Sequence, residues 1–552
     1  MKPQTMVYDS ENKIWKSNNY AFGDYVKQTL GEIFLKTMST LDEEKVLEYF
    51  YDTGIERTAG EIYSDAVKIA INLQRLGVEK GDVVVLYSMN NPKISALAFG
   101  CYLIGAVVNY FETKFEQEHI DYALSIVDPK VILFEDVYET DIRDSLNRSP
   151  LLFLKYLLSI DSQAAPNVTT ELLIDVGPTL LEKFKTVNLG DSTKATASLV
   201  FTSGSTGIPK AVDISHALLI NGFKTWWCQA DNRADLQADS ILFSFSPIRW
   251  ISQVDFMLQS ILLGLKRVCA SGLPSGAYGR EIIQKGGVTH FFSTPVIFTE
   301  ILRAISDKDI HALDSLRIVH LGGEPPSQAL IDLARQKARN SIIYRCYGMT
   351  EVSSCISNDE HINGGPLLPG LQMKVLDDNL QPVGPNIRGQ LCIKAPVPFK
   401  GYLKMDNSKY YFDDGFFLTG DFGFMDEKHN LHVESRYKDL VRAQNGILIP
   451  NPIESLVADL PEVTSARLVG YKKSPEDAYD VGAIFVALKD NFKEDERKQE
   501  IRSKIGYLLE SSLSTAQLDV IRHIHFIDTM PLTSAGKVNR VTLRQQAQKM
   551  TL

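Results

Sequence analysis

The sequence predicts an α/β protein with a large N-terminal domain and a small C-terminal domain. Its 552 residues exceed what one hydrophobic core usually holds, so we expect at least two domains. In the first half, short β-branched runs alternate with apolar helical segments, which is typical of stacked α/β subdomains. After Gly370 short strand-like runs dominate, and after about Glu434 helices and strands mix again. We therefore expect an N-terminal domain over 1–435, which includes a β-rich subdomain, and an α+β C-terminal domain over 436–552.

The first half contains a strand–helix–strand pattern. Val83–Tyr87 and Lys130–Phe134 are short apolar runs of the kind found in buried strands, and Ala66–Leu76 has helical spacing. The apolar run Ile94–Val108 is shorter than the roughly 20 residues that span a bilayer. We expect one buried helix there, and a sheet with crossover connections around it.

The later segments follow the same logic. Two further strand-like runs precede Gly370, at Arg317–Leu321 and Ile342–Tyr344. The β-rich subdomain is predicted from short runs separated by Asp, Gly and Pro turns, at Gln372–Leu376, Gln390–Ile393 and Leu431–Val433. The C-terminal domain is predicted from a strand, a charged helix and an alternating strand, at Asp480–Leu488, Glu494–Leu509 and Ile521–Ile527.

Composition narrows the class of protein and its partners. Hydrophobic residues make up 44% and charged residues 23%, which excludes a disordered or low-complexity chain. A net charge of −10 without a long basic cluster argues against nucleic acid as the main partner. The six cysteines lack CxxC spacing, which favours reduced thiols. We expect a cytoplasmic or peroxisomal protein without a signal peptide or membrane span, although Met550–Leu552 does not match a Ser-Lys-Leu signal.

The strongest local signal is a loop of hydroxyls and glycines that follows an apolar run and ends in a lysine. It comprises Thr202, Ser203, Gly204, Ser205, Thr206, Gly207 and, after Ile208-Pro209, Lys210. Its glycines permit close backbone approach, and its hydroxyls and lysine are donors that suit a polyphosphate. It lacks the Gly-Lys-Ser/Thr of a P-loop, and its apolar lead-in argues against a flexible linker.

Thr202–Lys210 resembles the phosphate-binding signature of the acyl-adenylate-forming superfamily. That superfamily contains acyl-CoA synthetases, 4-coumarate–CoA ligase, beetle luciferases and the adenylation domains of peptide synthetases. The resemblance implies that this loop binds the β- and γ-phosphates of ATP, with Thr206 beside the metal. Ala211 is one departure, because the family usually has glycine there.

The other motifs of the superfamily follow in order. Gly322-Gly323-Glu324-Pro325 resembles its turn against adenine and the acyl pocket. Cys346 precedes Tyr347-Gly348-Met349-Thr350-Glu351, which matches the motif Tyr-Gly-x-Thr-Glu. The resemblance implies that Tyr347 stacks on adenine, that Thr350 meets the adenylate phosphate and that Glu351 binds Mg²⁺. A flat aromatic ring and a hard carboxylate oxygen suit those roles.

Three more positions continue the resemblance, and the last two of them lie in the predicted C-terminal domain. Asp421 of Thr419-Gly420-Asp421 is expected to bind the ribose hydroxyls, and Arg436 to hold ribose and phosphate. Lys537 in Leu532–Lys537 resembles the adenylation lysine, which bridges the acyl carboxylate and the α-phosphate. The resemblance therefore implies that residues 1–435 build the ATP and acyl site, and that 436–552 form a mobile lid.

The acyl pocket is less clearly defined by the sequence. The motif that lines the acyl tunnel in many members reads Pro247-Ile248-Arg249-Trp250 here. Trp250 is either an aromatic gate or a core tryptophan, and Arg249 either attracts a carboxylate or is exposed. Asn221, Ser354 and Cys355 are further candidates for the lining. Gly222 occupies the position of an arginine that helps bind luciferin in beetle enzymes, which disfavours a luciferase.

The departures from the superfamily cluster at the residues for the CoA step. Ser435 replaces a common aspartate at the hinge, Arg442 replaces a common lysine, and the glycine that contacts CoA is shifted to Asn445-Gly446. Arginine keeps the charge of lysine but not its shape. Lys438, Arg442 and Gly446 are the residues expected to serve thioester formation.

Taken with the motifs, the resemblance implies an AMP-forming acyl-CoA synthetase. ATP, Mg²⁺ and CoA would serve to convert a carboxylic acid to its acyl-adenylate and then to its thioester. We expect a medium- or long-chain fatty acid, with an arylpropenoate as the alternative. A non-catalytic relative that binds a nucleotide or lipid carboxylate, and a luciferase-like oxygenase, stay open. A peptide-synthetase unit would need a carrier domain, for which the residues after Lys537 leave no room.

Overall fold

The computed structural model divides the chain into two compact units. The first is built mainly from Ile14–Met373 and Ile393–Phe417, and the second from Lys374–Cys392 and Leu418–Leu552. The boundary predicted at residues 435 and 436 for the functional domains stays a prediction. The structure describes residues 6–18, 27–161, 166–202, 208–227, 236–306, 309–360, 364–412, 415–444, 446–474, 476–532 and 538–551.

The first unit contains two large sheets rich in parallel strands. The six-stranded sheet has the order β10-β9-β6-β5-β7-β8 and is parallel except at its edge strand β10. Its strands are β5 (Val83–Tyr87), β6 (Val107–Tyr110), β7 (Val131–Phe134), β8 (Tyr156–Ser159), β9 (Thr196–Thr202) and β10 (Lys210–Ser215). Three of these strands, β5, β6 and β7, are completely or almost completely buried, as expected of parallel strands covered on both faces.

The eight-stranded sheet has the order β16-β15-β14-β13-β11-β12-β3-β4. Its six inner strands are parallel, and the two edge strands β4 and β16 run antiparallel to their neighbours. Its strands are β3 (Val46–Phe50), β4 (Ile55–Thr58), β11 (Ile241–Ser244), β12 (Lys266–Cys269), β13 (His290–Ser293), β14 (Ile318–Leu321), β15 (Ile342–Met349) and β16 (Ser354–Asp359). The carboxyl ends of β13, β14 and β15 therefore lie along one edge.

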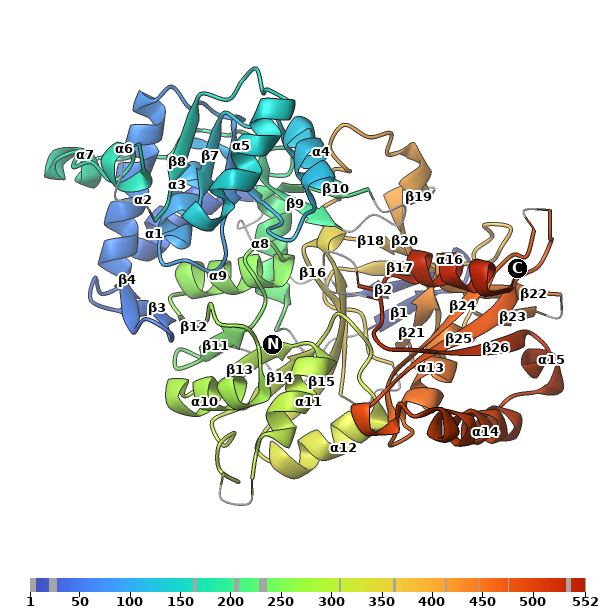
Figure 1. The fold of residues 1–552 in the computed structure, drawn as a ribbon. Helices are drawn as coiled ribbons and strands as arrows, with labels where there is room; N and C mark the ends of the chain where they lie inside the picture. Colours follow the sequence, from blue (N-terminus) through green and yellow to red (C-terminus); the bar gives the residue numbers. More distant parts are fainter. Residues whose placement is uncertain are drawn as a thin grey trace. The chain divides into compact units, whose positions relative to one another are not determined.

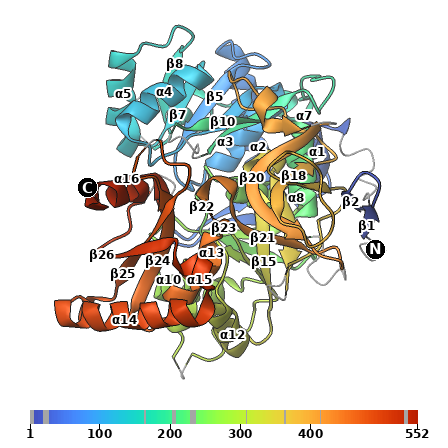
Figure 2. The same cartoon turned by 90° about the vertical axis from the view of Figure 1, so that its right-hand side faces the viewer.

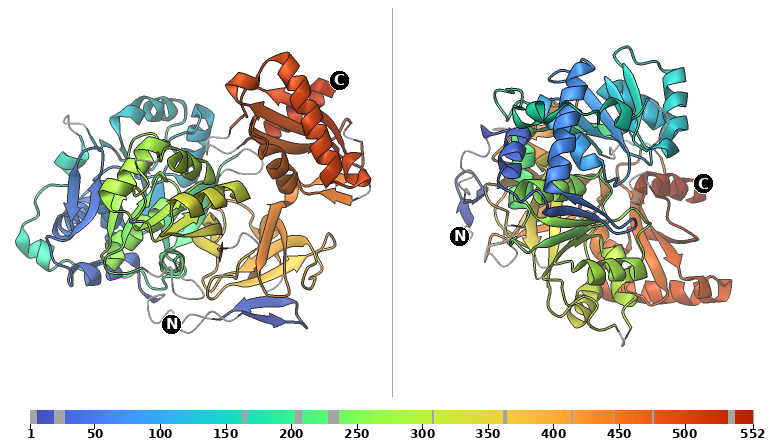
Figure 3. Two further views of the ribbon diagram at one scale, coloured as in Figure 1. Left: turned by 90° about the horizontal axis from the view of Figure 1, so that it is seen from below. Right: turned by 90° about the vertical axis from the view of Figure 1, so that its left-hand side faces the viewer.

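Helices cover both faces of these sheets in layers (Figures 1 and 3). The layer between the sheets holds α1 (Leu30–Met38), α2 (Ala59–Arg75), α3 (Ile94–Ile104), α8 (His216–Thr225) and α9 (Ile251–Leu263). On the outer face of the six-stranded sheet lie α4 (Gln117–Val127) and α5 (Glu139–Arg148). On the outer face of the eight-stranded sheet lie α10 (Gly276–Gly286), α11 (Pro295–Arg303) and α12 (Gln328–Lys337). Two short helices, α6 (Val168–Glu171) and α7 (Pro178–Glu182), complete this unit. The mixed α/β class predicted from the sequence is confirmed.

One predicted element was wrong in its extent. The apolar run Ile94–Val108 is not a single helix, because α3 ends at Ile104 and Val107 already begins β6. Gly105 makes this break, with φ of +72° in the left-handed region that glycine adopts without strain. Within the described part of the chain, no helix combines the length and apolar character needed to cross a bilayer. The cytoplasmic or peroxisomal location stays a prediction.

The predicted β-rich subdomain corresponds to one seven-stranded antiparallel sheet. Three of its strands, β17 (Gln372–Leu376), β18 (Gly389–Lys394) and β20 (Phe416–Met425), contain the points at which the two units divide. Its other strands are β1 (Met6–Asp9), β2 (Ile14–Ser17), β19 (Tyr411–Phe412) and β21 (Leu431–Arg436). The dark-blue hairpin β1–β2 lies at the edge of the sheet, where β2 pairs with the first residues of β17 (Figure 3, left).

The C-terminal part of the second unit is a small α+β fold. A three-stranded sheet holds β24 (Val463–Tyr471), β25 (Val481–Leu488) and β26 (Ile521–Ile527) in that order. It is joined by the hairpin of β22 (Val441–Ala443) and β23 (Gly446–Leu448), and by the helices α13 (Pro450–Ala458), α14 (Asp495–Ser512), α15 (Thr515–Leu518) and α16 (Arg540–Thr551).

Alternation along β25 gives this fold its two cores. Ile484 and Val486 pack in a cluster with α13 and α14, whereas Ala483 and Phe485 pack against α16. Successive side chains on a strand point to opposite faces, so one apolar strand supplies both cores. Figure 2 shows α14 below the strands and α16 above them.

Candidate active site

Thr202 and Lys210 lie opposite each other at the ends of the predicted phosphate loop, on the edge of the six-stranded sheet. They are paired residues of the antiparallel strands β9 and β10. The loop residues between them, Ser203 to Gly207, lie outside the described residues. The Lys210 ammonium lies 4.7 Å from the centroid of the Tyr402 ring and 4.5 Å from that of Tyr410. These cation–π contacts hold the lysine at the end of the loop.

Glu351 is joined to the same group of residues. It lies in a single 3-10 turn, Thr350–Val352, directly after β15, and it is 7% exposed. The Tyr402 hydroxyl donates a hydrogen bond of 2.5 Å to Glu351 Oε1, and Tyr402 also bridges to the backbone of Val212 in β10. Tyr402 thus touches both Lys210 and Glu351, although they lie far apart in sequence. The sequence analysis missed Tyr402, and no local pattern around it signals this role.

The predicted adenine residues lie at the carboxyl ends of β14 and β15. Gly322 follows β14, and a Cβ there would lie 2.8 Å from Cε2 of Phe292. Gly323 has φ of +88°, which favours glycine. Tyr347 and Glu324 are half-buried, and Met349 ends β15.

Cys346 precedes Tyr347 on β15 and is buried. Neighbouring residues on a strand point to opposite faces, which separates the Cys346 thiol from the Tyr347 ring. Burial and a hydrogen bond to Cys355 raise the pKa of the Cys346 thiol well above its ordinary value. Gly348 lies at the β-bulge that follows Tyr347, where a Cβ would lie 2.6 Å from the Ser354 carbonyl oxygen.

Helix α8 and strand β16 bring together three residues predicted to line the acyl pocket. Asn221 lies on α8, and Ser354 and Cys355 begin β16. All three are buried, and the Ser354 hydroxyl donates to the Gly222 carbonyl at 3.2 Å. A Cβ at Gly222 would lie only 1.9 Å from the Ser353 carbonyl oxygen. The backbone therefore has no room for an arginine here.

Arg249 corrects one expectation, because it is neither exposed nor available to a substrate carboxylate. It is 5% exposed, forms an ion pair with Glu112, and donates a hydrogen bond of 2.7 Å to Thr113 Oγ1. Burial raises the pKa of Glu112, and the Arg249 guanidinium opposes that shift.

Trp250 is the residue directly before α9, and it is half-buried, whereas Trp227 is buried.

The two predicted ribose residues of the second unit are direct neighbours. Asp421 on β20 and Arg436 on β21 are paired in the sheet, with 3.1 Å between Oδ1 and Nε. Asp421 is 5% exposed, and its backbone N–H donates to Thr419 Oγ1. Gly420 has φ of +73°. This turn places a buried carboxylate and a half-exposed guanidinium side by side.

The residues predicted for the CoA step form a second group in the same unit. Arg442 pairs with Asp378 at 3.3 Å, and its guanidinium carbon lies 4.8 Å from the centroid of the Tyr437 ring. The Tyr437 hydroxyl donates to the same carboxylate at 2.8 Å. Lys438 follows Tyr437 and accepts a hydrogen bond on its carbonyl oxygen from Arg544.

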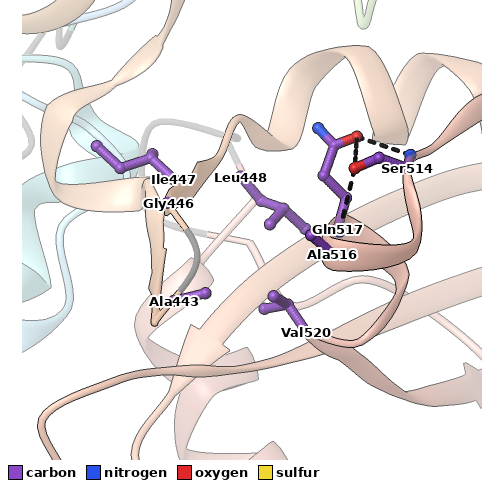
Figure 4. Close-up of a pocket in the computed structure, with 8 residues that line it drawn as sticks. All are labelled: Ala443, Gly446, Ile447, Leu448, Ser514, Ala516, Gln517 and Val520. Carbon is purple, nitrogen blue, oxygen red and sulfur yellow. Dashed lines mark hydrogen bonds between the residues drawn. The ribbon is translucent and has the colours of Figure 1, made fainter.

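Gly446 borders two cavities of this unit. One, of about 330 Å³, lies between the β22–β23 hairpin and α15, and is lined by Ala443, Gly446, Ile447, Leu448, Ser514, Ala516, Gln517 and Val520 (Figure 4). The other, of about 370 Å³, also takes in Asp378 and Arg388. Gly446 has φ of +128°, which favours glycine. Lys537, the predicted adenylation lysine, lies outside the described residues.

Glu351 is the described residue that fits a Mg²⁺ ion, because it offers a hard carboxylate oxygen. Among the described residues, no group of three or more His, Cys, Asp or Glu side chains could hold a metal by itself. Mg²⁺ commonly combines one or two carboxylates with substrate phosphates rather than a protein cage. A single carboxylate beside a phosphate loop agrees with that behaviour.

Comparisons with known proteins identify the family. The model of the AMP-binding enzyme family matches residues 39–403. A 2-succinylbenzoate–CoA ligase of Listeria monocytogenes is 25% identical, over 90% of this chain and 96% of its own length. A probable 4-coumarate–CoA ligase of Dictyostelium discoideum is 26% identical, over 86% and 88%. The fold is shared with ATP-bound MatB of Rhodopseudomonas palustris, with a TM-score of 0.79 and 21% identity over 95% of this chain and 100% of that one. The chain belongs to the AMP-binding enzyme family, within the adenylate-forming superfamily that its motifs resemble.

Proposed function

We propose that the protein is an AMP-forming acid–thiol ligase with ATP, Mg²⁺ and CoA as its co-substrates. In the first step a substrate carboxylate oxygen attacks the α-phosphorus of ATP, which gives acyl-adenylate and releases pyrophosphate. In the second step the CoA thiol attacks the acyl carbon and AMP leaves. The observation that carries the proposal is the contact of Tyr402 with both Lys210 and Glu351. This contact gathers a phosphate ligand and a metal ligand at the mouth of the hydroxyl–glycine loop.

Each predicted residue has a role in adenylation. Thr202, Lys210 and the loop between them bind the β- and γ-phosphates, while Tyr347 stacks on adenine. Asp421 accepts hydrogen bonds from the ribose hydroxyls, and Arg436 orients that carboxylate through their ion pair. Mg²⁺, when bound, offsets the phosphate charge, and Glu351 supplies one of its oxygen ligands. Lys537 stabilises the charge that develops between carboxylate and α-phosphate.

The CoA step is assigned to the C-terminal residues. Lys438 and Arg442 are cations suited to the anionic CoA nucleotide, and the glycine at 446 permits close backbone approach. Arg442 keeps the charge that the family commonly places there as lysine. A rotation of the predicted lid over 436–552 would exchange Lys537 for these residues between the two steps.

The identity of the carboxylic acid substrate is a separate part of the proposal. The sequence analysis favours a medium- or long-chain fatty acid, with an arylpropenoate as the alternative. The two relatives are named for 2-succinylbenzoate and 4-coumarate, both aromatic acids, so they support CoA ligation without favouring a fatty acid. The non-catalytic alternative is disfavoured because the Glu351–Tyr402–Lys210 group is intact. The packing of Gly222 against Ser353 disfavours a luciferin site of the beetle type.

Two linked assays test the proposal. Carboxylate-dependent exchange of pyrophosphate into ATP, measured over a panel of fatty and aromatic acids, reports adenylation alone. Addition of CoA with the best acid then reports thioester and AMP formation. We expect exchange that requires the acid and Mg²⁺, and thioester that requires CoA. A protein that exchanges pyrophosphate with none of the acids is not an adenylating enzyme for those classes.

A further inference from the structure

Helix α9 carries a buried carboxyl group that its surroundings leave without partners. Asp255 is 0% exposed, and neither of its carboxylate oxygens has a hydrogen-bond partner among the described residues. Buried polar groups are nearly always hydrogen-bonded, since an unpaired one opposes folding. Burial raises the pKa of Asp255 well above its ordinary value. A group that opposes folding in this way needs an explanation from function.

The next turn of the same helix shows the ordinary alternative. Gln259 is also 0% exposed, but its amide accepts a hydrogen bond from Trp227 Nε1 at 2.9 Å and donates one to the Phe223 carbonyl at 3.0 Å. Residues four apart share a helix face, so Asp255 and Gln259 both belong to the buried face of α9. The fold therefore satisfies one of these polar groups and leaves the other unsatisfied.

Asp255 borders the predicted acyl pocket. Helices α8 and α9 and strand β16 pack against one another, which brings the helix that carries Asp255 against the strand that carries Cys355. Two further oxygen atoms of this region, Asn221 Oδ1 and Ser353 Oγ, are buried and have no hydrogen-bond partner in the described part of the chain. Asn221 and Cys355 are both expected to line the acyl pocket. Three elements that pack together, α8, α9 and β16 with the turn before it, thus carry unpaired oxygens and residues predicted to line the acyl pocket.

We propose that Asp255 binds a hydroxyl or amino group on the acyl part of the substrate, so that the acid is a donor-bearing carboxylic acid. As a buried neutral carboxyl, Asp255 still offers a carbonyl oxygen that accepts a hydrogen bond from a hydroxyl, and an ammonium group beside it would favour its ionised form. Asn221 Oδ1 is a second acceptor, so a ligand with a hydroxyl or amino hydrogen supplies the missing donor. An unsubstituted hydrocarbon tail would leave these oxygens unpaired in the complex. Sites built to hydrogen-bond a substrate group discriminate strongly against analogues that lack it. The inference rests on the proposed acid activation, and it selects among the acids that the comparisons leave open.

Two matched series of acids test the inference. One holds cinnamate, 4-hydroxycinnamate and 4-aminocinnamate; the other holds octanoate, 8-hydroxyoctanoate and 8-aminooctanoate. For each acid, kcat/KM of pyrophosphate exchange is compared in the wild-type protein, Asp255→Leu and Asp255→Asn. We expect the wild-type protein to prefer at least one donor acid over its unsubstituted parent by about tenfold or more. Asp255→Leu should remove most of that preference by raising activity with the parent acid.

The Asn variant separates the two kinds of donor. An amide still accepts a hydrogen bond from a hydroxyl or from the neutral aryl amine of 4-aminocinnamate, but it carries no charge for the ammonium group of 8-aminooctanoate. Asp255→Asn should therefore keep a preference for hydroxyl and aryl-amino acids and lose a preference for 8-aminooctanoate. Gln259→Leu is the matched control. It removes two hydrogen bonds from the same helix face, and it should lower Tm without changing the ratio between donor and parent acids.

A second measurement keeps the result independent of catalysis. Thermal shifts with each acid should show that donor acids raise Tm of the wild-type protein more than their parents do, and that Asp255→Leu cancels the difference. Equal shifts for donor and parent acids, or a preference that survives Asp255→Leu, would overturn the inference even where exchange is strong. Absence of exchange together with Asp255-dependent shifts would instead refute acid activation and leave the donor site standing.

Discussion

The predicted sites of the two units are held by different forces. In the first unit, Lys210 and Glu351 are joined through Tyr402, beside strands buried within two large sheets. In the second, Arg442 and its partner Asp378 are both exposed, and the half-exposed Arg436 pairs with a buried carboxylate, Asp421. Exposed ion pairs contribute little to stability, so their side chains can change partners at little cost. The difference indicates that the predicted phosphate and metal ligands are positioned in advance, whereas Arg442, which is predicted to serve the CoA step, is held loosely enough to change partners.

The largest expected effect concerns a more buried ion pair of the second unit and its contribution to the free energy of unfolding. Arg540, three residues after Lys537, begins α16 and pairs with the buried Glu454 at 2.6 Å and with Asp439 at 3.5 Å. Arg540→Ala leaves the buried Glu454 with the more distant Arg467, at 3.8 Å, as its cation, while Asp439 keeps Arg544. We therefore expect the free energy of unfolding to fall by about 3 kcal/mol. Urea denaturation followed by circular dichroism measures the change.

Arg544→Ala is the matched control for that experiment. Arg544 is more exposed and pairs with Asp439 alone, at 2.7 Å. Its loss should lower the stability by about 1 kcal/mol or less. Equal effects of the two substitutions would show that Arg540 does not fix the start of α16.

The next largest effect separates the two half-reactions. Lys537→Ala should lower pyrophosphate exchange about 10²–10³-fold, because one well-placed donor to a developing negative charge contributes that much. Thioester formation from acyl-adenylate supplied as a reagent should stay within a few-fold of the wild-type rate. A parallel loss of both activities would mean that Lys537 supports the fold rather than adenylation.

Glu351→Gln tests the metal ligand of the first unit. The amide keeps the shape and the hydrogen bond from Tyr402 but removes the charge that favours Mg²⁺. We expect adenylation to fall about 100-fold, with partial recovery as the Mg²⁺ concentration rises. A loss that no Mg²⁺ concentration relieves would place Glu351 outside the metal site.

Tyr402→Phe removes the hydroxyl that orients Glu351 but keeps the ring beneath Lys210. Loss of a partner that orients a metal ligand typically lowers affinity about 10–100-fold. We expect about a tenfold rise in the Mg²⁺ requirement for exchange. Tyr410→Phe is the control, because it also keeps its ring beside Lys210, and it should leave the requirement unchanged.

Much of the fold follows from local patterns that tertiary packing reinforces. Val83–Tyr87, Gln372–Leu376 and Ile521–Ile527 were predicted as strands with the bounds that the structure gives them. Each is bounded by turn residues or breaks in the apolar pattern. Ile94–Val108 was assigned wrongly because hydropathy does not change where the helix ends, and the turn at Gly105 depends on backbone conformation.

The candidate site was predicted from sequence motifs. Residues outside those motifs, and contacts between residues distant in sequence, were not predicted. Tyr402 contacts Lys210 through the bridge that it makes to β10, which no short sequence window shows. The sequence did not decide whether Arg249 attracts a substrate carboxylate or is exposed to solvent, because its ion-pair partner Glu112 is distant in sequence. Asp255 does have a signal in the sequence, since it is the sole acidic residue in the apolar segment Ile251–Leu263.

Arg442 offers the smallest and most selective test of the contrast between the units. Arg442→Lys restores the residue common in the family but gives up the packing against Tyr437, so the thioester step should change by about threefold or less. Arg442→Ala removes the charge and should raise KM for CoA about tenfold. Pyrophosphate exchange should stay unchanged in both variants, because Arg442 is assigned to the CoA step and the predicted phosphate and metal ligands, Lys210 and Glu351, are held in the first unit. If pyrophosphate exchange falls together with thioester formation, Arg442 also serves adenylation. The adenylation residues and the CoA residues would then not be separate sets.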